Sequence, residues 1–169
     1  MAAQLQHTNT PFLKKQFPIT IVCDHISSAS NIGSIFRLAD AFGVEQIIFT
    51  GIKPLLSRRM EKTARTTHKT VPYKYIEDEN DFINNLKKEK QYIIALEITS
   101  NSSPVGTMQL PKNTAIVLVI GNENHGVSKK WLETAHTVHH IEMYGNNSSM
   151  NLAHATGICL YELTNKLKI

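Results

Sequence analysis

Three loops rich in glycine and asparagine limit the folds open to this chain. They comprise residues 31–37 (NIGSIFR), 121–128 (GNENHGVS) and 141–151 (IEMYGNNSSMN), and each follows an apolar strand pattern and opens a helix pattern. In α/β proteins the ligand site lies at such strand ends, because helix N-termini and free backbone N–H groups point there. The three loops therefore predict one composite pocket in an α/β fold.

The rest of the pattern predicts a mostly parallel sheet with helices on both faces. Residues 114–120 are apolar on both faces, as a central parallel strand requires, and Pro72 favours an edge position for its strand. Ser128 can cap a short helix around Trp131, and Gly43 ends the first helix. The strands are expected at residues 19–23, 45–50, 70–76, 91–96, 114–120 and 138–141, and the longer helices at 31–42, 79–90 and 151–167.

Length and composition predict one domain over residues 18–169, preceded by a loose N-terminal arm at residues 1–17. The chain has neither the roughly twenty consecutive apolar residues of a membrane helix nor a signal pattern, so we expect a cytoplasmic protein. Cys23 and Cys159 lack CxxC spacing and are interpreted as reduced, structural thiols. His136, His139 and His140 straddle a helix end and a strand, where alternation separates the last two, so no metal site is expected.

Local chemistry restricts what the pocket can bind. The loop at 121–128 imitates a phosphate-binding P-loop, but Val127 stands where that motif requires lysine. No GxGxxG follows the first strand, which argues against a dinucleotide. The remaining groups, mostly backbone donors and acceptors beside Arg37 and Glu123, suit a neutral or zwitterionic cofactor. Arg37 is expected on a helix face near the pocket mouth, where it could clamp a phosphate.

A basic segment lies between the second and third expected strands, as a loop with about one helical turn. A lysine-rich loop is commonly a solvated surface, but beside this pocket it could contact a phosphate backbone. Glu61 is its only acid within residues 53–74. The residues that could make this contact are Arg58, Arg59, Lys62, Arg65 and Lys69.

The ordered motifs N-x-G-x-x-x-R at 31–37, G-N-E-x-x-G at 121–126, and I-x-M-x-G then S-x-N at 141–151 resemble those of the SpoU (TrmH-type) branch of the SPOUT superfamily of RNA ribose 2′-O-methyltransferases. The resemblance covers residues 19 to 163. It implies a Rossmann-like sheet with a C-terminal trefoil knot, S-adenosylmethionine as cofactor, and a homodimer that shares its RNA site across the interface.

The resemblance also assigns candidate site residues. Thr99, on a less specific loop, and Met150, where the family usually has leucine, belong to the cofactor set. Arg37 has two open roles, general base or electrostatic clamp on a phosphate, because a guanidinium holds its proton to a pH above about 12. The implied catalytic residues are Asn31, Arg37, Glu123, Ser149 and Asn151, and the implied cofactor-binding residues are Thr99, Gly121, Ile141 and Met150.

Two functions stay open. The first is a methyltransferase acting on tRNA more than on rRNA, an expectation based on the minimal length and on residues 62–64. The second is a catalytically inactive RNA-binding or assembly factor on the same fold. Taken singly, Asn31 and Ser149 fit helix capping as well as they fit a functional role, and Glu123 equally fits a first-turn acid favoured by the helix dipole. The complete set in family order favours the enzyme.

Overall fold

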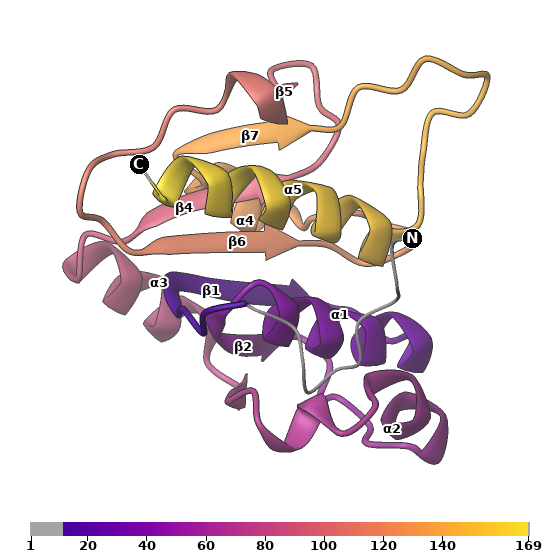
Figure 1. Cartoon of the computed structure of the whole chain (residues 1–169). Helices are drawn as coiled ribbons and strands as arrows, with labels where there is room; N and C mark the ends of the chain where they lie inside the picture. The colour runs from indigo at the N-terminus through magenta and orange to yellow at the C-terminus, as the bar shows by residue number, and fades with distance from the viewer. Residues whose placement is uncertain (1–11, 169) are drawn as a thin grey trace, which may run out of the picture.

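The computed structural model describes residues 12–168, which form one seven-stranded sheet with all neighbouring strands parallel (Figure 1). The strand order is β3-β2-β1-β6-β4-β7-β5. The strands are β1 (Phe17–Asp24), β2 (Val44–Thr50), β3 (Tyr73–Ile76), β4 (Tyr92–Leu96), β5 (Ser103–Pro104), β6 (Ile116–Ile120) and β7 (Thr137–His140). The helices are α1 (Ala29–Ala41), α2 (Arg58–Ala64), α3 (Glu79–Lys88), α4 (Lys129–Thr134) and α5 (Leu152–Leu167), with 3₁₀ turns η2 (Thr67–Lys69) and η3 (Val105–Thr107).

Strand alternation divides the interior into two layers, one on each face of the sheet. In the central strand β6, Ile116, Leu118 and Ile120 pack toward the layer that contains α1 and α5, and Val117 and Val119 pack toward α3 and α4. All five side chains are fully buried. The expected doubly covered parallel sheet is confirmed, since helices cover both faces (Figure 1).

Polar residues at the helix ends account for where α1 and α5 begin and end. The Ser28 hydroxyl accepts a hydrogen bond from the Asn31 N–H at 3.4 Å and caps α1. Gly43, with φ of +61°, follows the last turn of α1 and allows the chain to turn into β2. The Asn151 side chain caps α5 by accepting from the backbone N–H of Ala153 and His154. These caps place the expected polar loops at helix N-termini.

The basic segment is more ordered than expected, because α2 makes about two helical turns where the sequence predicted a loop with one. Ser57 caps this helix, and Met60 and Ala64 are fully buried. Gly33 of α1 allows the two helices to meet, because a Cβ at this position would lie 2.6 Å from the Met60 carbonyl oxygen. Tertiary packing therefore stabilises a helix whose exposed face is almost entirely charged.

Three other expectations needed correction. The first strand starts at Phe17, which is buried and donates its N–H to the Gly43 carbonyl at 2.8 Å, so the arm ends one residue earlier than predicted. Residues 1–11 of that arm lie outside the described residues. The two-residue strand β5 was missed. Ser128 precedes α4, but its side chain makes no capping bond, and its N–H donates to Asp24.

Other features agree with the sequence. Strand β3 is at one edge of the sheet, as Pro72 predicted. Cys23 and Cys159 are both free and buried, which confirms structural thiols. Burial raises the pKa of the Cys159 thiol to about 12. No helix within residues 12–168 is long and apolar enough to cross a membrane. The C-terminal trefoil knot stays a prediction.

Candidate active site

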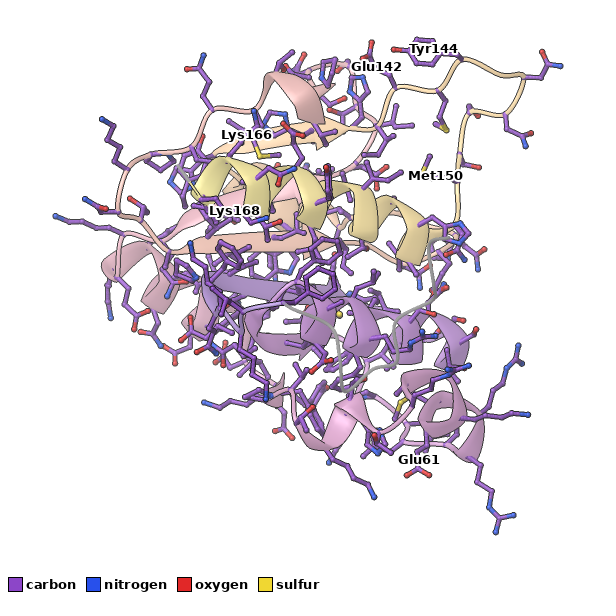
Figure 2. All side chains as sticks on the ribbon, viewed as in Figure 1. Glu61, Glu142, Tyr144, Met150, Lys166 and Lys168 are labelled. Carbon is purple, nitrogen blue, oxygen red and sulfur yellow. The ribbon has the colours of Figure 1, made fainter. Side chains whose placement is uncertain are left out.

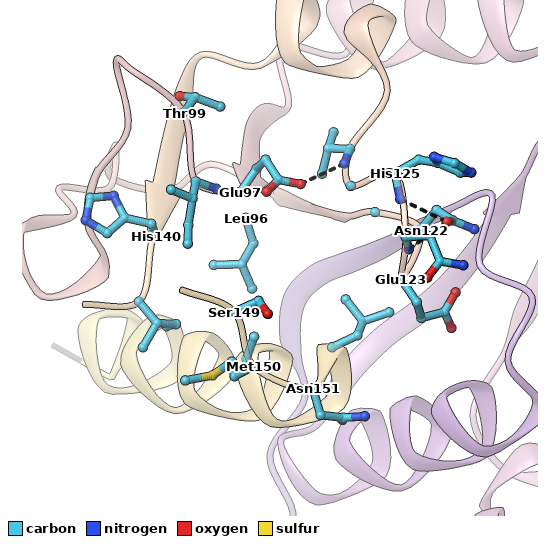
Figure 3. Close-up of a pocket in the computed structure, with 18 of the residues that line it drawn as sticks. Leu96, Glu97, Thr99, Asn122, Glu123, His125, His140, Ser149, Met150 and Asn151 are labelled. Carbon is cyan, nitrogen blue, oxygen red and sulfur yellow. Dashed lines mark hydrogen bonds between the residues drawn. The ribbon is translucent and has the colours of Figure 1, made fainter. Parts of the chain in front are cut away.

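A cavity of about 670 Å³ opens at the carboxyl ends of β4, β6 and β7 (Figure 3). Its volume is in the range of small-molecule and cofactor sites. All three polar loops contribute to it, together with the loop after β4 and the start of α5. The expected composite pocket is therefore present. Of the predicted catalytic and cofactor residues, it brings together Asn31, Thr99, Gly121, Glu123, Ile141, Ser149, Met150 and Asn151.

A chain of hydrogen bonds joins the three loops at the cavity wall. The Asn31 side-chain amide donates to Glu123 Oε1 at 2.9 Å, and the Asn31 side-chain oxygen accepts from the Asn151 amide at 3.0 Å. Glu123 also accepts from the Ser28 N–H at 3.3 Å. Because the Asn151 oxygen already caps α5, the donor and acceptor ends of both amides are fixed. The three motifs thus share one bonded unit although Asn31 and Asn151 are 120 residues apart.

The loop at 121–128 is a tight backbone hairpin. Asn122 and Gly126 exchange two backbone hydrogen bonds, at 3.0 and 2.9 Å. A Cβ at Gly121 would lie 2.1 Å from the backbone of Gly126 and Val127, so this position has no space for a side chain. Gly126 has φ of +69°, a conformation that favours glycine. Both glycines are needed for the shape of this cavity wall.

Two carboxylates that sequence reasoning missed hold the end of the same hairpin. Asp24, at the end of β1 and fully buried, accepts from the Ser128 N–H at 2.7 Å and contacts His25 Nδ1 at 2.6 Å. Glu97, directly after β4, accepts from the Val127 N–H at 2.8 Å. Both acids follow an apolar strand pattern directly, which was the only signal in the sequence that could have identified them.

The opposite wall is formed by the loop after β4 and the end of β7. Ser102 accepts from the Thr99 N–H at 3.0 Å, and its hydroxyl lies 2.9 Å from His140 Nδ1. Thr99 and His140 both line the cavity. His139 points the other way, is buried, and lies 3.2 Å from the Ser103 carbonyl. Burial lowers the pKa of His139, which favours the neutral ring.

No group of three histidine, cysteine, aspartate or glutamate side chains within residues 12–168 is placed to hold a metal ion. His139 and His140 lie on opposite faces of β7, as alternation predicted.

Arg37 is the predicted catalytic residue that the structure does not bring to the cavity. It is exposed on α1 and is absent from the cavity lining. Its neighbour Leu38 instead lines a separate shallow groove between α1 and α5. The groove is apolar, and Ile158 and Tyr161 of its lining are 42% and 61% exposed. Arg37 therefore does not join the other predicted catalytic residues in this cavity, and its expected place near the pocket mouth stays a prediction.

The predicted RNA-binding residues lie on and just after α2, which packs against α1. Arg58, Arg59, Lys62, Arg65 and Lys69 are all exposed. Figure 2 shows Glu61 at this end of the molecule, where nitrogen-tipped side chains extend outward from α2. The Glu61 carboxylate lies 3.9 Å from His68 Nε2. None of the five basic side chains forms an ion pair with a carboxylate of the described residues. The basic surface is available to a polyanion.

Comparison with known proteins gives consistent results. A profile described as the SpoU rRNA Methylase family matches residues 18–161. A tRNA (guanosine(18)-2′-O)-methyltransferase of Aquifex aeolicus is 30% identical over 149 residues, which cover 88% of this chain and 70% of that protein. A 23S rRNA (guanosine-2′-O-)-methyltransferase, RlmB, of Blochmanniella floridana is 29% identical over 93% of this chain and 62% of that protein. This chain spans between 56% and 62% of the length of that protein and six further curated relatives.

Solved structures of the same type share the fold. The TrmH/SpoU tRNA modifying enzyme of A. aeolicus superposes with a TM-score of 0.81 at 28% identity, covering 92% of this chain and 78% of that chain. An AdoMet-bound rRNA methyltransferase from Sinorhizobium meliloti superposes with a TM-score of 0.77 at 27% identity, covering 92% and 59%. The motifs, the sheet and the profile match agree, and this chain belongs to the SpoU rRNA methylase family.

Proposed function

We propose that this protein transfers a methyl group from S-adenosylmethionine to a ribose 2′-hydroxyl of RNA. The observation that carries the proposal is the hydrogen-bonded chain from Glu123 through Asn31 to Asn151. It joins the three family motifs at the wall of a cofactor-sized cavity. A merely structural use of these residues as caps would not require the three side chains to bond to one another.

The cavity suits S-adenosylmethionine in size and in chemistry. Thr99, Gly121, Ile141 and Met150 line it, and we assign them to cofactor binding. Gly121 has no space for a side chain, so the backbone itself forms that part of the wall. The cofactor supplies an electrophilic methyl group. The S. meliloti rRNA methyltransferase, which shares the fold of this chain, has been solved with AdoMet bound.

The protein must align a weak nucleophile and assist its deprotonation, because an alcohol is mostly protonated at neutral pH. We assign Asn31, Glu123, Ser149 and Asn151 to the positioning of the target ribose, since all four line the same cavity. Arg37 keeps two possible roles, proton acceptor or clamp on the adjacent phosphate. Guanidinium groups hold their proton to a pH above about 12, which favours the clamp.

We further propose that the protein works as a homodimer. The apolar groove between α1 and α5 exposes Ile158 and Tyr161, and a second copy of the chain would cover it. Arg37 adjoins this groove through Leu38 and does not line its own chain's cavity. A dimer across this face would allow Arg37 to serve the partner's cavity, which explains why one chain does not bring the set together.

Mixing two inactive variants tests this arrangement. Arg37→Ala and Asn151→Ala subunits would each be inactive alone, but a mixed dimer would hold one intact composite site if Arg37 acts on the partner. Random exchange of equal amounts should then restore about a quarter of the wild-type activity. Failure to restore activity between subunits that exchange would contradict the shared site.

The substrate follows from the basic surface, which suits a phosphate backbone, and we propose tRNA over rRNA. The relatives named above include enzymes for both RNA classes. This chain covers a larger share of the A. aeolicus tRNA enzyme, 70%, than of the B. floridana rRNA enzyme, 62%. A cytoplasmic location is part of the same proposal, since the substrate is there.

Methyl transfer from labelled S-adenosylmethionine to purified tRNA and, separately, to 16S and 23S rRNA tests the proposed function. The expected result is label on tRNA that disappears with Arg37→Ala. Label on rRNA alone would correct the substrate. Cofactor binding without label on any RNA, or no cofactor binding, would favour the inactive RNA-binding factor.

A further inference from the structure

Apart from two histidines, His125 and His140, the only formally charged side chains that line the cavity are acidic. Two glutamates, Glu97 and Glu123, are among the lining residues, and no lysine or arginine of the described chain is. Glu123 is exposed, and its Oε1 accepts from Asn31 and Ser28. Glu97 is half-buried and lies between the loop after β4 and the hairpin at 121–128, facing the cavity (Figure 3).

The Glu97 carboxylate is rigidly held and has spare acceptor capacity. Oε2 accepts from the Val127 N–H at 2.8 Å, and Oε1 accepts from the Ile98 N–H at 2.9 Å. A carboxylate offers about four acceptor positions, so these two bonds leave about two unused. No cationic nitrogen lies within 4.0 Å of this carboxylate in the described residues. Its charge therefore has no compensating partner from the described chain.

The packing around Glu97 fixes where this charge lies. A Cβ at Gly126 would be 2.2 Å from Glu97 Oε2, so the hairpin backbone is pressed against the carboxylate. The Glu97 N–H also donates to the His139 carbonyl at 2.9 Å, which ties this residue to β7. A negative charge that is half-buried, rigid and unpaired beside a binding cavity favours a cationic ligand, because attraction is stronger where water is excluded.

The cofactor of the proposed function has a net positive charge, since its methionine part carries a sulfonium and an ammonium group against a single carboxylate. We propose that Glu97 is a cofactor-binding residue whose carboxylate recognises the positive charge of the methionine part of S-adenosylmethionine. The inference rests on the proposed function. It predicts that the cavity binds the intact, charged cofactor more tightly than uncharged adenosine derivatives because of this carboxylate.

Two other uses of Glu97 compete with this proposal and give different outcomes. The carboxylate could serve only to hold the hairpin through Val127, or it could bind the ribose hydroxyls of the adenosine part. In either case its loss would weaken every adenosine ligand to a similar extent. Charge recognition instead predicts that the loss depends on the charge of the ligand.

Calorimetric titration of three ligands into the wild-type protein and Glu97→Gln separates these cases. The ligands are S-adenosylmethionine, S-adenosylhomocysteine, which lacks the sulfonium charge, and 5′-methylthioadenosine, which lacks both cationic groups. Glu97→Gln should weaken S-adenosylmethionine about tenfold or more, and 5′-methylthioadenosine less than about twofold. Loss for S-adenosylhomocysteine as well would locate the contact at the ammonium, and its absence would locate it at the sulfonium.

Glu142→Gln is the matched control, because Glu142 is exposed on the loop after β7, outside the cavity lining, and the substitution changes the net charge equally (Figure 2). It should change each affinity less than about twofold, as an effect of net charge alone would be small at such a site. Equal weakening of all three ligands by Glu97→Gln, or no weakening, would overturn the inference while leaving the proposed function intact. A wild-type protein that binds none of the three would overturn both.

Discussion

Replacing Asn31 with alanine should both destabilise the protein and inactivate it. Asn31 is 8% exposed and bonds at its two ends to two other motifs. The substitution removes one hydrogen bond to a carboxylate and one to a neutral amide. It leaves Glu123 with the Ser28 N–H and leaves the Asn151 amide without its protein partner.

The size of the effect follows from those two bonds. A hydrogen bond to a charged group contributes about 1.5–3 kcal/mol and a neutral one about 1 kcal/mol, which gives roughly 2.5–4 kcal/mol in total. Water can reach the exposed Glu123 carboxylate and replace part of this, so we expect about 2 kcal/mol. Methyl transfer should fall further, about 100-fold, because positioning groups tolerate little displacement.

Urea unfolding of Asn31→Ala, Glu123→Ala and the double variant measures the coupling. A direct bond predicts a coupling free energy of about 1–2 kcal/mol between the two positions. Asn85→Ala is the control, because its amide bond to Asp81 is exposed and long at 3.4 Å, and alanine favours a helix. A loss below about 0.5 kcal/mol for Asn31→Ala, with no coupling to Glu123, would refute the bonded unit.

Three further predictions concern the hairpin, the second helix layer and the basic surface. Gly121→Ala should cost about 2 kcal/mol or more and abolish cofactor binding, since its Cβ would lie 2.1 Å from facing backbone; thermal unfolding with and without cofactor measures both. Glu79 is partly desolvated by burial, but hydrogen bonds from Lys130 and Trp131 outweigh this and lower its pKa from 4.5. The carboxylate therefore stabilises the fold above pH 4.5, and this contribution is lost as the pH falls below that value. When the pH is lowered through this range, the urea midpoint measured by Trp131 fluorescence should fall less for Glu79→Gln than for the wild type. Arg58→Ala should weaken RNA binding and lower the slope of log affinity against log salt by about 0.7–0.9, and an unchanged slope would remove Arg58 from the interface.

Much of the sheet could be predicted because its strands are continuous apolar runs flanked by turn and cap residues. Ser28, Gly43 and Asn151 mark helix ends by local chemistry, and those ends agree with the structure within about two residues. The order of the strands could not be derived this way. Strand β6 pairs with both β1 and β4, and these contacts join residues far apart in the chain.

The site was predictable where motifs mark it and was missed where single residues form it. Asn31, Glu123 and Asn151 belong to ordered motifs and are bonded to one another. Asp24 and Glu97 are isolated acids at strand ends, and only the folded hairpin shows what they hold. The helix α2 was predicted too short, as a single turn, because two buried side chains among charged neighbours give a weak periodic signal.

Arg37 shows a further limit of sequence reasoning. Helical spacing from Asn31 gives its place on α1 but not which cavity that face meets. Arg37 is absent from the cavity lining of its own chain, and the next residue, Leu38, lines the exposed apolar groove. A contact between two copies of a chain has no local pattern in the sequence. In the fold of one copy it is visible only as an exposed apolar surface.

Alkaline hydrolysis of RNA labelled by the enzyme tests the central proposal most directly. A ribose that carries a 2′-O-methyl group cannot form the cyclic phosphate through which alkali cleaves the chain, whereas a methylated base leaves cleavage intact. The proposal predicts that the methyl label appears in alkali-stable dinucleotides with the wild-type protein and is absent with Asn31→Ala. Label recovered in mononucleotides, or transfer that survives in Asn31→Ala at the wild-type rate, would contradict ribose methylation by this site.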